Sequence, residues 1–458
     1  MSEYQHFLHR SAVKANDAAH RQKLDKAIAS YDLQVNATKT RQFKNWGHAR
    51  ALAAAIKNDT LAHLPDLLEQ FEKNFLAAGG KVFWAETATD AASYVKALAQ
   101  KHQVKRVVKS KSMTTEEIHL NENLEKIGVE VWESDLGELI VQLNNEKPYH
   151  IVTPAMHKSK EEISRLFHDR LKAPLTDNAE ELTMIARRHL RDVYLTSGIG
   201  ITGANFLIAE LGAIVVTENE GNARLSMACP PVHVVIAGIE KILPRFSDLS
   251  LFLPLLATSG TGQEITSYNS IVFGPRHFNE SDGPTEMHVI LLDNGRSALY
   301  QQEKFREILR CIRCGACLNA CPVFHTIGGH SYNTTYQGPI GSVITPHYNG
   351  FAKFQHLAAA SSLCGACSDV CPVHIDIHHL LLENRYEAVH RYHLSKFWHA
   401  AMRVYAWAMS DSRRLQSMRT WLLRLRPLQR LFFRSGETPP ELSVKSFHEL
   451  WAEHENKS

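Results

Sequence analysis

Long apolar runs and net charge are both scarce in this chain of 458 residues. No run of apolar residues is long enough to cross a bilayer, and the N-terminal sequence MSEYQHFLHR lacks the apolar region of a signal peptide. We therefore expect a protein that neither spans a membrane nor is exported. The formal net charge is only +3, from 51 Lys and Arg against 48 Asp and Glu. This balance argues against nucleic acid as a partner of the molecule as a whole.

Signatures of familiar catalytic centres are also missing. The sequence shows no paired carboxylates and no Ser-His or Cys-His arrangement at a legible spacing, and it has no haem or flavin signature. The run 198–203 satisfies G-x-G-x-x-G, but no clear strand precedes it and no acidic residue completes the pattern. A nicotinamide site is therefore disfavoured, and we assign no catalytic residue from the sequence.

Cysteine is almost confined to two short runs. Seven of the eight cysteines lie in CIRCGACLNACP, which begins at Cys311, and in CGACSDVCP, which begins at Cys364. The eighth, Cys229, is expected to be a small buried apolar residue. Because an oxidising compartment would pair such clustered thiols as disulfides, we expect the cytoplasm.

The spacing of the first run is C-x2-C-x2-C-x3-C-P, which is typical of thiolates that hold a cubane iron–sulfur cluster. Gly315 and Gly365 suit the tight turn that lets neighbouring thiolates converge on one cluster. A pair of zinc knuckles would also use C-x2-C pairs. Zinc sites have no reason to repeat C-x3-C-P, so we favour iron–sulfur clusters.

Two clusters are expected, because in two-cluster ferredoxins the cysteine before proline ligates the other cluster. On that rule the first cluster, a [4Fe–4S] centre, takes Cys311, Cys314, Cys317 and Cys371, and the second takes Cys321, Cys364 and Cys367. Ser361 stands where a further cysteine would complete the second run. The second centre is then [4Fe–4S], with Ser361, another side chain or solvent as its fourth ligand, or [3Fe–4S], or a cluster with a labile iron; the first two are favoured.

Four regions follow from the hydrophobic patterns. Residues 1–78 predict a helical N-terminal extension, 79–296 an α/β domain with a mostly parallel sheet, 297–392 a helical domain that holds the two clusters, and 393–458 a basic, aromatic helical region. In the α/β domain the apolar runs predict strands over 82–85, 104–108, 129–132, 151–152, 213–217, 232–237 and 289–292. Helices are expected over 91–100, from Thr114 with Glu117 in a capping box, and over 160–171, 177–190 and 204–211.

An anion or ligand site is expected in the α/β domain. Lys109 and Lys111 follow a strand and precede a helix N-terminus, where both the lysines and the helix dipole favour an anion. Gly221 and Asn222 lie in a glycine-rich turn whose backbone N–H groups offer a second place for an anion or carboxylate. A solvated loop and a plain turn are the competing interpretations.

Several longer motifs together resemble the lactate-utilisation iron–sulfur protein family, B component. They are KSMTTEEI (111–118), WESDLGEL (132–139), TGANF (202–206), ENEGN (218–222) and LLDNGR (291–296), followed by the two cysteine runs. The resemblance implies an α/β domain similar to the glucosamine-6-phosphate isomerase and CoA-transferase group, then a two-cluster ferredoxin domain. It also implies that the seven cysteines are cluster ligands, and that the protein acts in oxidation of L-lactate to pyruvate beside companion A and C components. It supplies no ligand at Ser361.

Two further segments invite an interpretation. Residues 323–360, between the cysteine runs, predict a long loop that serves either as a partner surface or as a plain cover over the clusters. Residues 395–434 contain nine Lys or Arg against one acid, with interspersed aromatic residues. Such helices pack within the protein, dock a partner, or lie peripherally on an anionic membrane surface.

The preferred hypothesis is an iron–sulfur electron-transfer subunit for L-lactate oxidation that passes electrons to an unidentified acceptor. The alternative is a transferase or ligand sensor that acts through the α/β domain, with clusters that are regulatory or structural.

Overall fold

The computed structural model describes residues 2–392, 396–424, 443 and 445–456. The chain forms two compact units, Met1–Tyr386 and Glu387–Ser458, which are described separately.

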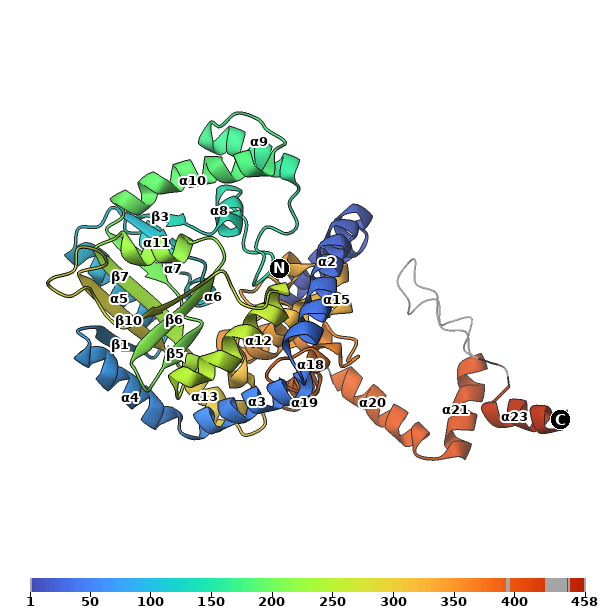
Figure 1. The fold of residues 1–458 in the computed structure, drawn as a ribbon. Coiled ribbons are helices and arrows are strands. Elements are labelled where there is room, and N and C mark those ends of the chain that lie inside the picture. Colours follow the sequence, from blue (N-terminus) through green and yellow to red (C-terminus); the bar gives the residue numbers. More distant parts are fainter. Residues whose placement is uncertain (1, 393–395, 425–442, 444, 457–458) are drawn as a thin grey trace. The chain divides into compact units, whose positions relative to one another are not determined.

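A six-stranded, wholly parallel sheet lies at the centre of the first unit (Figure 1). In spatial order its strands are β1 (Lys81–Ala85), β10 (Glu286–Leu292), β7 (Val232–Gly238), β4 (Ile199–Thr202), β2 (Arg106–Lys109) and β3 (Glu130–Glu133). Central parallel strands are covered on both faces and therefore appear in the sequence as continuous apolar runs. The expected α/β class is confirmed, as are the strands expected over 82–85, 104–108, 129–132, 232–237 and 289–292.

Strand β4 was not expected, because its sequence resembles a glycine-rich loop. Gly200 lies in this strand, and a Cβ there would come within 1.8 Å of the Ser226 carbonyl oxygen. The glycine is needed because helix α11 (Asn222–Ala228) packs directly against the strand.

Helices cover both faces of this sheet. On one face lie α5 (Ala88–Lys101) and α7 (Leu120–Glu125), which pack on the inward side chains of β2, β4 and β7. The short helix α6 (Met113–Glu117) contacts α7 and β7. On the other face, Val108 packs with α8 (Leu136–Leu143), α9 (Lys160–Leu171) and α10 (Ala179–Thr196). The helices expected over 160–171 and 177–190 are thus confirmed.

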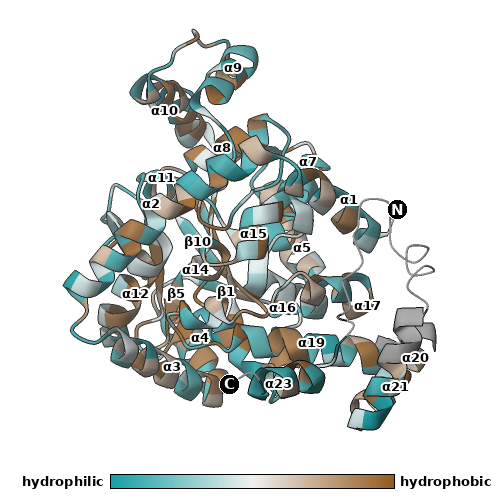
Figure 2. Cartoon of the chain, turned by 90° about the vertical axis from the view of Figure 1, so that its right-hand side faces the viewer, coloured by the Kyte–Doolittle hydropathy of each residue, from teal (hydrophilic) through white to brown (hydrophobic). Residues whose placement is uncertain are grey.

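A second, four-stranded sheet corrects one expectation. Its order is β8 (Ile242–Leu243), β5 (Phe206–Ile208), β6 (Ala213–Glu218) and β9 (Tyr268–Val272). The expected helix over 204–211 is wrong, because its centre forms β5 and pairs antiparallel with β6. Its side chains are buried on both faces of the strand, so a short apolar run carried no period that distinguishes strand from helix. Figure 2 shows the strands as mostly hydrophobic and the surrounding helices as mixed.

Residues 151–152, expected as a strand, form a bend in a loop. The N-terminal region is helical as expected, with α1 (Glu3–Ala15), α2 (Ala18–Gln42), α3 (Trp46–Ala62) and α4 (Leu64–Ala77). These helices contribute Leu24, Leu68, Phe71 and Phe75 to the main hydrophobic core. Helix α12 (Leu249–Thr261) packs against α2 and α3.

The segment 323–360 is mostly helical, not the long loop that its glycines and prolines predict. The cysteine region contains η3 (Arg306–Arg310), α14 (Ala316–Asn319), α15 (Pro322–Ile327), η4 (Gly329–Tyr332), α16 (Gly338–Asn349), α17 (Phe351–Phe354), η5 (Gln355–Ala359), α18 (Ala366–Asp369) and α19 (Ile377–Tyr392). Pro339 lies in the first turn of α16, where its missing N–H costs no hydrogen bond. Residues 338–346 are buried, so the prolines and glycines there pack against neighbours.

The second unit contains α20 (Lys396–Met409), α21 (Ser412–Arg424) and α23 (Phe447–Glu455). Parts of the basic, aromatic region, residues 395 and 425–434, lie outside the described residues. Among the described helices of the chain, none is long and apolar enough to cross a membrane.

Candidate functional site

The two cysteine runs adopt the same backbone conformation. Gly315 and Gly365 both have left-handed φ angles, 83° and 84°, and each begins a short helix, α14 or α18. The residue before the second cysteine of the first run, Arg313, has φ of 61°, and its counterpart Leu363 has φ of 56°. The chain therefore bends in the same way around each set of thiols, and α14 packs against α18.

A first thiol group joins both runs. Burial raises the pKa of the Cys317 thiol well above its ordinary value, and the charges of Cys311, Cys314 and Cys371 raise it further. Burial likewise raises the pKa of Cys314, with contributions from Cys371 and Cys311. Because such effects fall off with separation, these four thiols lie together. Cys371 is therefore near the three cysteines of the other run.

A second thiol group holds the remaining cysteines of the two runs. Burial and, to a smaller extent, the charge of Cys321 raise the pKa of Cys367 to about 11. Burial also raises the pKa of Cys321, with a contribution from Cys364. Cys364 is exposed, so this group reaches the surface. Ser361, at the position equivalent to Cys311, accepts a hydrogen bond through Oγ from the Leu363 N–H at 3.1 Å.

The donor chemistry of both groups fits iron–sulfur clusters. Thiolate ligands need stabilisation by N–H donors and positive charge, and the backbone N–H groups of Phe324 and Ile375 lie 3.5 and 3.4 Å from the Cys321 and Cys371 sulfur atoms. The cations Lys57, Lys241 and Arg313 all interact electrostatically with Cys311. The two sets of sulfur atoms could each hold one cluster.

A buried ion network lies beside the first thiol group. The Arg296 guanidinium donates from Nη1 and Nη2 to the two carboxylate oxygens of Glu117, both at 2.9 Å, and from Nε to Glu240 at 2.6 Å. Tyr336, in the segment between the cysteine runs, donates its hydroxyl proton to Glu117 at 2.7 Å. The expected capping box is wrong: Ser112 is the N-cap of α6, and Glu117 serves this network instead. The network thereby ties the α/β domain to the cysteine region.

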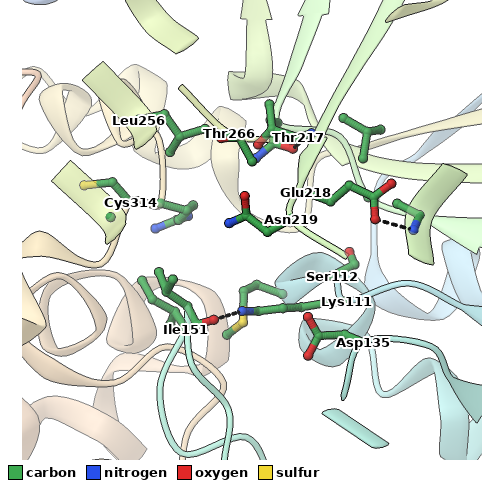
Figure 3. Close-up of a pocket in the computed structure, with 18 of the residues that line it drawn as sticks. Lys111, Ser112, Asp135, Ile151, Thr217, Glu218, Asn219, Leu256, Thr266 and Cys314 are labelled. Atoms are coloured by element: carbon green, nitrogen blue, oxygen red, sulfur yellow. Dashed lines mark hydrogen bonds between the residues drawn. The ribbon is translucent and has the colours of Figure 1, made fainter. Parts of the chain in front are cut away.

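A cavity of about 420 Å³ opens at the carboxyl ends of β2 and β4 and extends to the first cysteine run (Figure 3). In open α/β sheets this edge is where ligands bind. Lys111, Asp135 and Glu220 line the cavity from the α/β domain, and Arg313 and Cys314 line it from the cysteine run. A molecule in this cavity would therefore lie beside a thiol of the first group.

The four residues of the expected ligand site have different positions. Lys109 is fully buried; its Nζ lies 2.8 Å from Glu133 and 3.1 Å from Glu116, and it does not line the cavity. Lys111 does line it, and its Nζ donates to the Val152 carbonyl. Asn222 also lines the cavity, and Gly221, with φ of 77°, is the N-cap of α11 beside it.

Sequence analysis missed the carboxyl groups of the cavity. Burial and the negative charge of Asp135 together raise the pKa of Glu220 to about 7, so this carboxyl group can exchange a proton near neutral pH. Glu218 accepts the N–H groups of Ala223 and Arg224 at 2.7 and 2.8 Å and so caps α11. These carboxyl groups come from two separate segments of the sequence and meet only because the segments end at the same edge of the sheet. The one available signal was that the run 218–222 is among the motifs of the resemblance. Cys229 is exposed at the end of α11, so its expected burial is wrong.

Comparisons with known proteins agree with this arrangement. The LUD domain model matches residues 68–292, and the 4Fe-4S dicluster domain model matches residues 307–375. Lactate utilization protein B of Bacillus pumilus (strain SAFR-032) is 45% identical over 356 residues, which cover 78% of this chain and 74% of the relative. The chain belongs to the lactate utilization protein B family. Lactate utilization protein B of Anoxybacillus flavithermus (strain DSM 21510 / WK1) is 47% identical over 348 residues, 76% of this chain and 74% of that protein. That of Bacillus subtilis (strain 168) is 46% identical over 348 residues, covering 76% of this chain and 72% of the relative.

The cavity of this lactate utilization protein B family member draws on both matched domains. Lys111, Asp135 and Glu220 lie within the LUD match, whereas Arg313 and Cys314 lie within the dicluster match. The site thus depends on the two domains occurring in one chain.

Proposed function

We propose that this chain is the iron–sulfur electron-transfer subunit of a multi-protein system that oxidises L-lactate to pyruvate. Its family relatives are named for lactate utilisation, and it carries the cysteines of a dicluster domain. The companions are the A and C components, the electron acceptor is a further unidentified partner, and the site of action is the cytoplasm. The sequence of residues 395–434 is basic and aromatic, as in segments that make peripheral contact with the inner face of a membrane.

One observation carries the two-cluster part of this proposal: Cys371 of the second run interacts electrostatically with Cys314 and Cys317 of the first. Such exchange of one ligand between runs is the ligation pattern of two-cluster ferredoxins, and it supports the proposal of two neighbouring clusters that exchange electrons. The first cluster, [4Fe–4S], takes Cys311, Cys314, Cys317 and Cys371. The second takes Cys321, Cys364 and Cys367.

The second cluster is [4Fe–4S] or [3Fe–4S]. Its open position lies at the surface, because Cys364 is exposed and Ser361 is partly exposed. The Ser361 Oγ accepts the Leu363 N–H and keeps a second lone pair with which it could ligate iron. A cysteine at position 361 would supply the missing thiolate.

The test is iron, sulfide and zinc analysis with paramagnetic resonance on anaerobically purified protein and on Ser361→Cys. We expect about seven to eight irons per chain, a signal on reduction, and reduction by L-lactate only when partners are present. Ser361→Cys should change the spectrum of the second cluster alone, and Ser362→Cys is the matched control. Zinc in place of iron and sulfide, or an unchanged second-cluster spectrum in Ser361→Cys, contradicts the respective part of the proposal.

A second candidate function is supported by the cavity at the edge of the sheet. In that case the α/β domain is a ligand sensor or transferase, and the clusters are regulatory or structural. A variant whose cluster cysteines are replaced by alanine separates the two functions. Retained ligand binding or group transfer by this variant favours the sensor or transferase, and loss of every function with the clusters favours electron transfer.

A further inference from the structure

The end of the cavity beside the first thiol group is cationic. Arg313 and Lys241 line it there; Lys241 is buried, and the Arg313 side chain is 9% exposed. The Arg313 guanidinium is 4.4 Å from the centre of the Tyr336 ring, so its plane is held against an aromatic face. Arg313 belongs to the first cysteine run, where it lies between Cys311 and Cys314 in the sequence.

Arg313 has hydrogen-bonding capacity that the described residues do not use. Its Nη1 is buried and has no hydrogen-bond partner among them. Its Nη2 lies 3.8 Å from Glu240, which is longer than a hydrogen bond. A buried guanidinium N–H without a partner is costly, so a ligand that accepts from it is favoured.

The carboxylates nearby are already occupied. Arg296 takes both oxygens of Glu117 and one oxygen of Glu240. Of these two carboxylates, only the second oxygen of Glu240 is left to face the positive charges of Arg313 and Lys241. Buried cations in excess of carboxylates need a further anion close by.

Two anions could fill this need: the thiolates of the first cluster, or a carboxylate in the cavity. A cluster on the first thiol group would attract Arg313 through the nearby Cys311 thiolate, whereas the Arg313 side chain, with its unpartnered Nη1, lines the cavity. A guanidinium presents paired donors that match a carboxylate. Figure 3 shows Cys314 on one side of the cavity and Asp135 and Glu218 on the opposite side. These carboxylates repel an anion, so the negative end of a ligand is directed towards Arg313.

We propose that this cavity binds a small 2-hydroxy or 2-oxo carboxylate, with its carboxylate on Arg313 and Lys241 beside the first cluster. The substrate class rests on the proposed function in lactate oxidation, whereas the carboxylate anchor rests on the side chains of the cavity. At about 420 Å³ the cavity is of the size found for small-molecule sites and holds a three-carbon acid together with water.

The test measures binding of L-lactate and pyruvate to the full chain with its clusters loaded, by anaerobic calorimetric titration. Lactamide, which has the same shape but no negative charge, is the matched ligand control. We expect lactamide to bind at least roughly tenfold more weakly than lactate, because it lacks the charge-assisted hydrogen bonds to Arg313. Arg313→Gln and Lys241→Gln should each weaken lactate binding by a similar factor, and Arg313→Lys should restore part of it.

Arg50→Gln is the matched protein control. Arg50 donates to the carbonyls of Cys371 and Ser368 at 2.7 and 3.1 Å, so it adds positive charge near the first thiol group without lining the cavity. Its replacement should leave lactate affinity within about twofold. If Arg50→Gln and Arg313→Gln weaken binding equally, the arginines act only through the cluster charge and the proposal fails.

Equal affinity for lactate and lactamide, or unchanged lactate binding in both Arg313→Gln and Lys241→Gln, also overturns it. Iron and sulfide are measured on every sample. If Arg313→Gln loses its clusters, Lys241→Gln decides the result. Wild-type protein that holds two clusters but binds no carboxylate refutes this site and leaves the electron-transfer proposal standing; protein without iron and sulfide refutes the latter.

Discussion

Replacement of Arg296 by methionine tests the buried ion network between the α/β domain and the cysteine region. Arg296 is fully buried and makes four hydrogen bonds, to Glu117 twice, to Glu240 and to the Asp293 carbonyl. Methionine would leave the carboxylates of Glu117 and Glu240 buried without their main partner. Breaking a buried ion pair in this way costs about 3–5 kcal/mol.

The structure also predicts which interaction accounts for most of this loss in the free energy of unfolding. Glu117 keeps the hydrogen bonds from Asn294 and Tyr336, both at 2.7 Å, after Arg296 is removed. The cost therefore comes mainly from uncompensated negative charge. Glu117→Gln in the Arg296→Met background removes one of the two charges, so the double variant should be less destabilised than the sum of the single variants by about 1–3 kcal/mol.

The assay is urea unfolding of anaerobic protein, followed by tryptophan fluorescence. Arg245→Met is the matched control, because the Arg245 side chain is 67% exposed and lies 3.7 Å from Asp248. Loss of this long contact to a solvent-exposed arginine should change the free energy of unfolding by less than about 1 kcal/mol. The reasoning is refuted if Arg296→Met costs no more than Arg245→Met, or if the two network substitutions are additive.

Two further predictions concern acid stability and strand packing. Burial by itself would raise the pKa of Glu240, but Arg296, Arg313 and Lys241 lower it to about 2 from the ordinary 4.5. Its stabilising charge is therefore fully present above pH 4.5 and is lost as the pH falls towards 2, so Glu240→Gln should flatten the urea midpoint against pH in this window; an unchanged slope contradicts this. Gly200→Ala should cost at least about 1–3 kcal/mol, because its Cβ would lie 1.8 Å from the Ser226 carbonyl oxygen, whereas Gly47→Ala, whose Cβ would meet only Asn45 Oδ1 at 3.4 Å, should be neutral or stabilising in thermal melts. Equal melting temperatures for the two alanine variants would refute the close approach of α11 to β4.

The fold was predictable where burial produces a distinctive pattern. The run Val232–Gly238 is buried at every position, so it reads as a continuous apolar strand. Helix α9 begins at Ser159, whose side chain accepts the Glu162 N–H, and the residues that follow have the helical period. Strand β4 was not predicted, because it has Gly200 instead of an apolar residue at the position where α11 packs against it. Its missing side chain is explained only by a neighbour more than twenty residues away in the sequence.

The candidate site was predictable where one short motif contains all the chemistry. Cysteine spacing is enough to predict thiol ligands, but the network of Glu117, Glu240 and Arg296 joins residues that are far apart in the sequence. Lys109 and Lys111 looked equivalent because both follow a strand. The structure separates them, since Lys109 pairs with buried Glu133 and Lys111 lines the cavity.

The two cysteine runs show why the residues between ligands matter as much as the ligands. Arg313 and Leu363 occupy equivalent positions and share a left-handed backbone that is unfavourable for both side chains. The backbone is therefore dictated by the turn that brings the thiols together, and the side chain is free to serve another purpose. In the second run, which reaches the surface at Cys364, that position is an apolar leucine. In the first run it is an arginine that lines the cavity, so the charge occurs in the run that the cavity reaches.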